Sequence, residues 1–298
     1  MSVINTKIDL FRLARKVHKP LPLKNIFHII KYSILANKHR AEIENFFTRL
    51  NILNIPVTAE MLGVVEWPYI HNEWDVKTKL NKIAVHYEIV SKSYPHLMYI
   101  STAPCYKICD FNSVSKGIFI GIDYAKWFTR EGELVINIFR DDLRVASMAF
   151  TIGVHRDDIV AYVGAVQGIH AGVPEDESLA IFKILTKDFS GLRPRSLLLE
   201  ALKVVVSKLG VNKILGVSEQ NRHHRHAYFG NNQTTVFKND YNIFWEEHGG
   251  ELIKDIGFYE ISVVPAIKDL SEVVSKKRGL YRRRNELLTD LINTVTLG

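Results

Sequence analysis

The sequence predicts an α+β protein in which an N-terminal helical region precedes a mixed sheet with flanking helices. Two changes of pattern along the chain support this prediction. Over residues 1–95, apolar residues recur every three or four positions, which is the spacing of one face of a helix. From residue 96 to residue 274, short runs rich in Ile, Val, Phe and Tyr alternate with turn-like pieces, as strands do. Residues 275–298 form a basic C-terminal helix or tail in this prediction.

Three amphipathic helices are expected in the first region, at residues 8–17, 23–34 and 43–50. In each segment, apolar residues at helical spacing alternate with polar or charged residues. Pro20, Pro22 and Pro56 separate the segments, because proline cannot continue a helix. We therefore predict a helical region over residues 1–95.

Five segments of the second region have the composition of strands: 97–101, 117–124, 133–140, 144–153 and 159–167. Turn-like pieces such as Asp141-Asp142 divide them, which predicts an antiparallel meander. In the segment 133–140 both alternating sets of side chains are largely apolar, so we expect the sheet to be covered on both sides.

A helix over residues 175–187 should follow, and then a helix that begins at Pro194 and ends before Gly210. Apolar residues occupy most of the circumference of the second helix, so it should be largely buried. Further elements are expected at 213–218 (a buried strand), 241–250 (a short helix) and 257–264 (a last strand). A helix that leads into a strand of a sheet often presents chemistry at its ends.

The net charge of +7 is unevenly distributed along the chain. Residues 1–40 hold nine basic residues and one acidic residue, and residues 275–298 hold six basic and two acidic ones. The remaining body holds 24 basic and 29 acidic residues. The basic ends, residues 1–40 and 275–288, predict docking on an anionic membrane surface. Nucleic acid is a less favoured partner, because the acidic body shows no aromatic-lined basic groove and no known motif.

No signal peptide and no apolar run long enough to span a bilayer is recognised in the sequence. We therefore expect a cytoplasmic protein that is peripheral to the inner membrane where its basic ends dock. Cys105 and Cys109 stand without a second cysteine pair, which favours free thiols over zinc ligands or a disulfide.

The start of the helix at Pro194 is a candidate anion site. Arg193 precedes the proline, and its side chain only donates hydrogen bonds, so it cannot cap the free backbone amides. A phosphate or pyrophosphate held by Arg193 and Arg195 would supply the missing acceptor. Water, Ser190 or a nearby acidic side chain is the alternative acceptor.

The polar segment that follows residue 217 is the second candidate site. It contains Glu219, His223, His224 and Tyr228, together with two arginines and a third histidine. Histidine suits acid/base chemistry because its ordinary pKa lies near about 6.5. Metal binding is less favoured, because Glu219 is the only nearby carboxylate and no Cys accompanies it. A hydrated loop with structural hydrogen bonds remains the alternative.

Four segments resemble the VirK/YbjX family of enterobacterial proteins, and most closely its VirK members: LTKDFSGLRPRSLLLEAL at 185–202, ILGVSEQN at 214–221, YNIFWEEHGGE at 241–251 and SKKRGLYRRRNELL at 275–288. The resemblance covers most of the chain. It implies a bacterial factor for virulence and the cell envelope, concerned with the display of a surface protein and resistance to cationic antimicrobial peptides. An envelope protein or a lipid would then be its substrate or partner. The resemblance implies no catalytic residues.

The chain also resembles, more weakly, the GNAT acyltransferases, in which a strand meander precedes a helix whose glycine-containing start binds the coenzyme A pyrophosphate. Gly191, Ser196 and the segment 197–202 are similar to that pattern, and Asn221 follows the next strand as an asparagine often does there. The chain departs from the pattern at Arg193 and Arg195, where small glycines are usual. This resemblance implies a GNAT-like sheet and a coenzyme A thioester as cosubstrate.

Acyl transfer at the junction of the two candidate sites is the chemistry that we predict. Arg193 and Arg195 would hold the anionic group, His223 or His224 would act as base or acid, and Tyr228 would protonate the leaving group. The alternative function is a non-catalytic factor that binds anionic lipid or a protein at the inner membrane surface.

Overall fold

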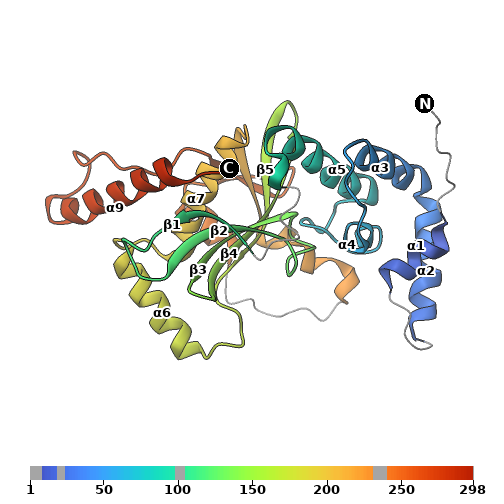
Figure 1. Cartoon of the computed structure of the whole chain (residues 1–298), viewed down its shortest axis with the longest axis horizontal. Coiled ribbons are helices and arrows are strands. Elements are labelled where there is room, and N and C mark those ends of the chain that lie inside the picture. Colours follow the sequence, from blue (N-terminus) through green and yellow to red (C-terminus); the bar gives the residue numbers. More distant parts are fainter. Residues whose placement is uncertain (1–8, 19–23, 98–104, 231–239, 298) are drawn as a thin grey trace.

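The computed structural model describes residues 9–18, 24–97, 105–230 and 240–297. Five helices come first: α1 (Leu10–Val17), α2 (Lys24–Lys38), α3 (Arg40–Ile52), α4 (Ala59–Gly63) and α5 (Val76–Ser93). They lie at one end of the molecule, and the C-terminal helix α9 (Ser275–Thr294) lies at the other end, with the sheet between them (Figure 1).

Within the described residues, the sheet has eight strands in the order β1-β2-β3-β4-β5-β6-β8-β7. The strands of the N-terminal half form an antiparallel meander: β1 (Tyr106–Asp110), β2 (Ile118–Tyr124), β3 (Leu134–Arg140), β4 (Leu143–His155) and β5 (Asp158–Gln167). Strand β6 (Lys213–Val217) follows two helices, and β7 (Glu251–Ile253) and β8 (Phe258–Ser262) follow a third. The β5/β6 pair is parallel and all other pairs are antiparallel. The predicted α+β class with a mixed sheet is confirmed.

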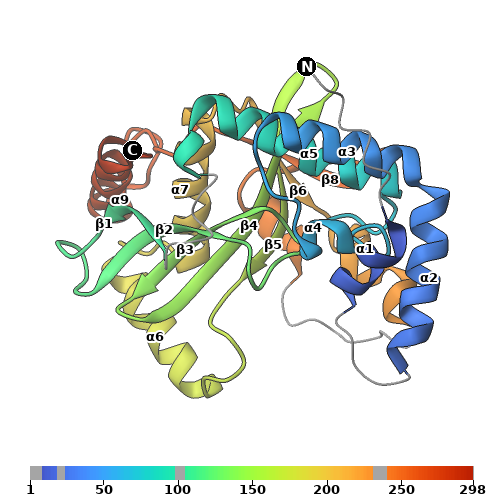
Figure 2. The ribbon, with the colours of Figure 1, turned by 45° about the vertical axis from the view of Figure 1, so that its right-hand side comes forward.

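Between β5 and β7, the described chain forms three further α-helices: α6 (Glu175–Asp188), α7 (Pro194–Lys208) and α8 (Tyr241–Glu247). Figure 2 shows α6 below the strands and α7 behind them. Helix α7 packs against β3, β4 and β5 and also against α9, so every residue from 197 to 206 is buried. These buried residues include Glu200 and Lys203. The two side chains pair inside the protein, with Lys203 Nζ 2.8 Å from Glu200 Oε1.

One predicted element lies outside the described residues, and some described elements were not predicted. The expected strand at 97–101 lies almost entirely outside the described residues, and the first described strand is β1. Two described strands were not predicted from the sequence: β1, and β7, which has only three residues and pairs with β8 alone. The sequence analysis also did not separate α4 and α5 within the helical region. The start of α5 has a local signal, since the Asp75 carboxylate accepts a hydrogen bond from the Thr78 N–H at 2.7 Å, as an N-cap residue does.

The hydrophobic core is continuous through residues 1–95, 96–274 and 275–298, because it includes Leu13, the sheet and Leu287. At the centre of the sheet, five consecutive residues of β3, Leu134–Ile138, are buried, so this strand is covered on both faces as predicted. A buried carboxyl group joins the helices to the sheet: Glu133 accepts hydrogen bonds from the hydroxyls of Tyr69 (2.8 Å) and Tyr87 (2.9 Å).

Candidate functional site

The parallel strands β5 and β6 part at their carboxyl ends. They pair only from Val160 with Lys213 to Val163 with Gly216, although β5 continues to Gln167. No other pair of described strands is parallel. Ligands of open sheets bind outside the carboxyl ends of parallel strands, so a ligand site is expected at this end of the sheet.

Two side chains of α8 occupy the place where these strands part. The Tyr241 hydroxyl accepts a hydrogen bond from the Val166 N–H of β5 at 2.8 Å. The Trp245 indole N–H donates to the Val217 carbonyl of β6 at 2.9 Å. Both side chains are buried. They satisfy main-chain groups that would otherwise lose a partner where the ladder stops.

Helix α7 begins at this same end of the sheet. Its N-cap residue, Arg193, makes no side-chain capping bond, and Pro194 occupies the first turn, as expected from the sequence. A side-chain carbon added at Gly168, directly after β5, would lie 3.0 Å from the Arg195 guanidinium. The α7 start therefore touches the end of β5.

Two cavities flank the α7 start and share Arg193, Arg195 and Phe244 as lining residues. One, of about 280 Å³, lies between the end of β5 and α8 and includes Tyr241. The other, of about 440 Å³, lies against α6, and Leu179 and Phe182 give it an apolar wall alongside Ser196, Phe244 and the arginines. Phe244 is therefore partly exposed in the site. Gly191 lies on the other side of the helix start, in a cavity that borders α9.

Arg193 and Arg195 differ in their surroundings. The Arg193 side chain is 71% exposed and forms a surface ion pair with Glu247 at 3.1 Å. Arg195 is half-buried, and desolvation lowers the pKa of its guanidinium from the ordinary value, with the charge of Arg193 acting in the same direction. Because Arg195 lies deeper, it is the better placed of the two to meet a ligand in either cavity.

The polar segment after β6 folds into three short turns at Glu219–Asn221, His223–Arg225 and Ala227–Phe229. Arg222, between the first two, is buried, and its guanidinium stacks 3.8 Å from the centre of the Tyr241 ring. It also donates to Glu219 at 3.1 Å, and Arg225 donates to the same carboxylate at 2.9 Å. Burial alone would raise the pKa of Glu219, but the nearby His224 and the hydrogen-bonded guanidinium groups of Arg222 and Arg225 lower it to about 2. Glu219 is a permanent carboxylate.

His223 and His224 are neutral at neutral pH. Burial, together with the nearby His224, Arg222 and Arg130, lowers the pKa of His223 to about 3. Burial also lowers the pKa of His224, whose Nε2 lies 3.7 Å from the Glu219 carboxylate. The Nδ1 of His223 lies 3.8 Å from Glu131 Oε1, and no group within the described ranges forms a hydrogen bond with this nitrogen.

Glu131 is a functional candidate that was not predicted from the sequence. Burial raises its pKa to about 7, although the charge of Arg222 and a hydrogen bond from Gln167 oppose the rise. The Gln167 amide, at the very end of β5, donates to it at 3.4 Å. Gly164 is the sequence feature that indicates a close backbone approach at this point of β5. In the structure the Glu131 backbone makes this approach, because any side chain at position 164 would collide with it.

The structure therefore brings most predicted site residues into two groups, one at the start of α7 around Arg195 and one after β6 around Glu219. Tyr241 joins them, because it lines the smaller cavity beside Arg195 and stacks against Arg222 behind it. Tyr228 lies further out, 37% exposed, with Arg130 over its ring at 5.2 Å. Asn221 accepts a hydrogen bond from the neighbouring Ser218 hydroxyl at 2.8 Å. It also contacts the N-terminal region, where it donates to Asn72 at 3.4 Å. The roles predicted for these residues stay predictions.

The sequence profile of a family described as "Protein of unknown function (DUF535)" matches residues 22–296. The chain belongs to this DUF535 family. Among curated proteins, the Escherichia coli (strain K12) "Uncharacterized protein YbjX" is 30% identical over 161 residues, which are 53% of this chain and 47% of the relative. An uncharacterized protein of Haemophilus influenzae is 36% identical over 118 residues, 40% of this chain and 38% of the relative.

A second uncharacterized protein of Haemophilus influenzae is 25% identical over 162 residues, 54% of the DUF535 chain and 51% of the relative. The chain thus spans about half or less of the length of these curated relatives. No solved structure matches it. The resemblance to the YbjX side of the expected family is confirmed.

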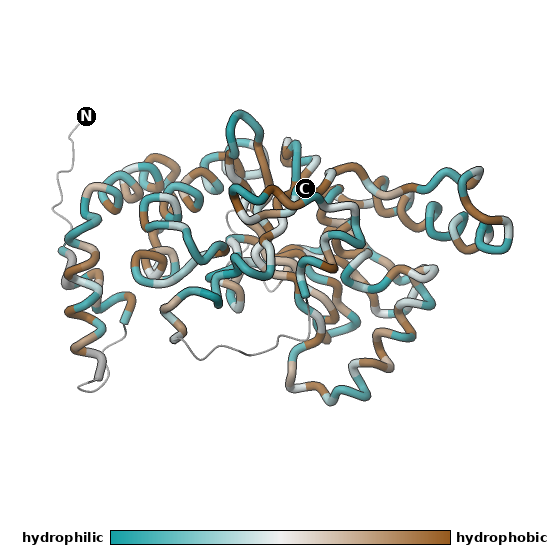
Figure 3. The backbone as a smooth tube through the Cα atoms, turned by 180° about the vertical axis from the view of Figure 1, so that it is seen from behind, coloured by the Kyte–Doolittle hydropathy of each residue, from teal (hydrophilic) through white to brown (hydrophobic). Residues whose placement is uncertain are grey.

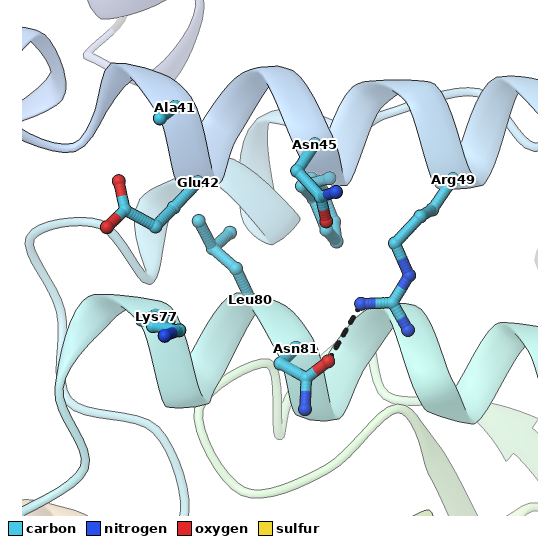
Figure 4. Close-up of a pocket in the computed structure, with 8 residues that line it drawn as sticks. Ala41, Glu42, Asn45, Arg49, Lys77, Leu80 and Asn81 are labelled. Atoms are coloured by element: carbon cyan, nitrogen blue, oxygen red, sulfur yellow. Dashed lines mark hydrogen bonds between the residues drawn. The ribbon is translucent and has the colours of Figure 1, made fainter.

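A further surface hollow of the DUF535 chain, of about 350 Å³, lies between α3 and α5 (Figure 4). The Arg49 side chain in this hollow already has partners, since it donates to Asn81 at 2.8 Å and binds Glu88 through two nitrogens at 2.6 and 2.8 Å. These bonds hold two helices together, and the hollow is a helix–helix groove.

Among the described residues there is neither a metal-binding cluster nor a helix that could span a membrane. Within them, no three His, Cys, Asp or Glu side chains are arranged to hold a metal ion. In the same ranges, each helix is too short or too polar to cross a bilayer.

Proposed function

We propose that this chain is an acyltransferase that uses a coenzyme A thioester at the carboxyl ends of β5 and β6. The observation that carries the proposal is the parting of this parallel pair directly beside the uncapped start of α7. The order of meander, helix start and strand is the one that a GNAT-like domain implies, with α6 inserted between β5 and α7.

The residues around this end fit the ligand. The first turn of α7 presents backbone N–H groups that Arg193 does not cap, and Arg195 adds positive charge beside them. This combination suits a pyrophosphate. The apolar wall formed by Leu179, Phe182 and Phe244 suits an aliphatic chain. A bound coenzyme A thioester would supply an activated acyl group.

Proton transfer falls to the cluster behind Tyr241. In the reaction, an acceptor nucleophile attacks the thioester carbonyl and the carbon–sulfur bond breaks, so one proton must leave the nucleophile and one must reach the thiolate. His223 is neutral and can accept the first proton. Glu131, whose Oε1 lies 3.8 Å from His223 Nδ1 and whose pKa is about 7, stabilises the imidazolium that forms when its own carboxyl group is ionised. His224 is the alternative base, with the Glu219 carboxylate in the equivalent place. Tyr228 is the proposed donor to the leaving group.

The proposed biological setting is that of a VirK-like virulence and cell-envelope factor. The resemblance of the α7 and C-terminal segments supports this setting, with an envelope protein or lipid as acyl acceptor. The competing function, non-catalytic docking on an anionic lipid surface, concerns a different surface of the molecule and does not depend on this site.

Calorimetry with coenzyme A and acetyl-coenzyme A tests the proposal. We expect the wild-type chain to bind both, and Arg195→Ala to weaken binding by about ten-fold or more, the loss of one charge-assisted bond of roughly 1.5 to 3 kcal/mol. Lys208→Ala is the matched control, since it removes an exposed base at the far end of the same helix. No heat from the wild type at millimolar ligand would rule the proposal out.

A further inference from the structure

Helix α2 has a second apolar face that points away from the protein. Its inner face packs into the core through Ile29, Tyr32 and Ala36. The outer apolar residues are exposed: Phe27 by 81%, Ile34 by 67%, and Ile26 and Ile30 by 49% each. At about 100° per residue, these four side chains share an arc of roughly 100° on the helix. Figure 3 shows apolar and polar stretches alternating along the N-terminal helices.

Basic residues border this arc. Lys31 and Lys38 are exposed and lie next to it on the helix surface. Beyond this basic border, about 100° around the helix from the edge of the apolar arc, α1 packs along α2 through the stacked rings of His18 and His28, 5.5 Å apart. Helix α1 adds further exposed bases, namely Arg12, Arg15 and Lys16.

Acidic groups offset only part of this charge. Glu66 faces Lys31 at 3.0 Å and His18 at 2.9 Å, but its side chain is buried behind them. Asp9 is the one acidic residue among residues 1–40, and its carboxylate caps α1 by accepting from the Arg12 N–H. Glu42 and Glu44 follow on α3 and form local pairs with His39 and Arg40.

We propose that this outer face of α2, defined by Ile26, Phe27, Ile30 and Ile34 with Lys31 and Lys38 at its border, docks on the surface of an anionic lipid bilayer. A helix with an apolar face and a basic border lies in the interface between headgroups and acyl chains, and each nearby base adds attraction to anionic headgroups. A second copy of the chain is a poorer occupant, because it would bring two strongly basic N-terminal regions together.

Co-sedimentation of the full chain with vesicles tests this docking. Vesicles of phosphatidylcholine alone are compared with vesicles in which part of it is replaced by phosphatidylglycerol. We expect binding to the anionic vesicles only, and weaker binding at high salt because salt screens the basic border. Phe27→Ser/Ile34→Ser should lower the affinity by about ten-fold or more, since two apolar contacts are lost. Lys38→Gln should lower it by about five-fold.

Two controls separate docking from general effects. Ile52→Ser/Val264→Ser removes apolar side chains of similar exposure, 74% and 68%, from other elements, and Lys208→Gln removes an exposed base from α7. Both should bind as the wild type does, and circular dichroism should show all variants folded. The proposal is wrong if the wild type ignores anionic vesicles or if Phe27→Ser/Ile34→Ser binds them as tightly. It is equally wrong if light scattering shows a dimer that this variant dissociates.

Discussion

At the scale of single residues, the site holds two carboxyl groups whose pKa values lie far apart. Glu219 is ionised because two arginines and a histidine surround it, and this lowers its pKa to about 2. Glu131 lies about 4 Å from His223 and close to the same Arg222, yet burial dominates and raises its pKa to about 7. Carboxyl groups whose pKa values are driven apart are typical of acid/base sites, and structural ion-pair networks perturb pKa values as well.

The pH dependence of stability should reveal Glu131. Its pKa in the folded chain, about 7, lies above the ordinary 4.5, so the folded state retains the proton longer and stability falls as pH rises through that window. The full loss is about 3 kcal/mol. Glu131→Gln cannot ionise, so its free energy of unfolding relative to wild type should rise between pH 5 and pH 8. Urea unfolding at the two pH values measures this, and an unchanged difference would show that Glu131 is not the titrating group.

At the scale of elements, the start of α7 depends on α9. The turn before the helix has two residues with positive φ, Ser190 at 52° and Gly191 at 81°. The Arg284 guanidinium of α9 donates to the Ser190 carbonyl at 3.2 and 3.3 Å. Part of the basic C-terminal segment therefore supports the candidate anion site, while Lys276, Lys277 and Arg282 remain exposed. Docking of residues 275–288 on an anionic surface stays a prediction for those outward bases.

Gly191→Ala tests this support. A side chain at Gly191 would lie 2.9 Å from the Arg284 guanidinium and would also be strained by the positive φ. Gly210→Ala is the matched control, since Gly210 has φ 76° and nothing within 4 Å of an added carbon. We expect about 1 kcal/mol of destabilisation in both. Weaker binding of coenzyme A is expected only in Gly191→Ala. Equal binding by both variants would show that α9 does not support the site.

At the scale of the whole molecule, the helical region and the sheet share one core. Tyr69 and Tyr87 reach across from the helices to Glu133, and the Thr151 hydroxyl lies 2.6 Å from the Tyr69 hydroxyl. All four side chains are buried. Burial raises the pKa of Glu133, and the two tyrosine hydrogen bonds oppose the rise.

Unfolding should accordingly be a single transition. Tryptophan fluorescence and far-ultraviolet circular dichroism should give the same urea midpoint, because residues 1–95 cannot leave the sheet without exposing the shared core. Tyr87→Phe should lower the common midpoint, with a loss of about 1 to 3 kcal/mol from the unsatisfied carboxyl oxygen. Two separate midpoints would instead make residues 1–95 an independent domain.

Local patterns were sufficient for most elements. Strands β2 to β5 of the meander, the helix from Pro194 to Lys208 and the glycine-ended α8 each follow from periodicity, proline and glycine within a short window. The uncapped start of α7 was also predictable, because it depends only on the identity of Arg193 and Pro194. The charge distribution of the ends was a matter of counting.

Other features were decided by contacts between residues far apart in the chain. Glu131 and Gln167 meet across 36 residues, and Arg222 reaches Tyr241 across a segment that connects two elements. Burial, and with it each pKa, exists only after these segments pack together, because desolvation depends on every neighbouring element. The sequence alone therefore determined the elements and the charged ends, whereas the tertiary structure determined which carboxyl group keeps its proton and which face of α2 is exposed.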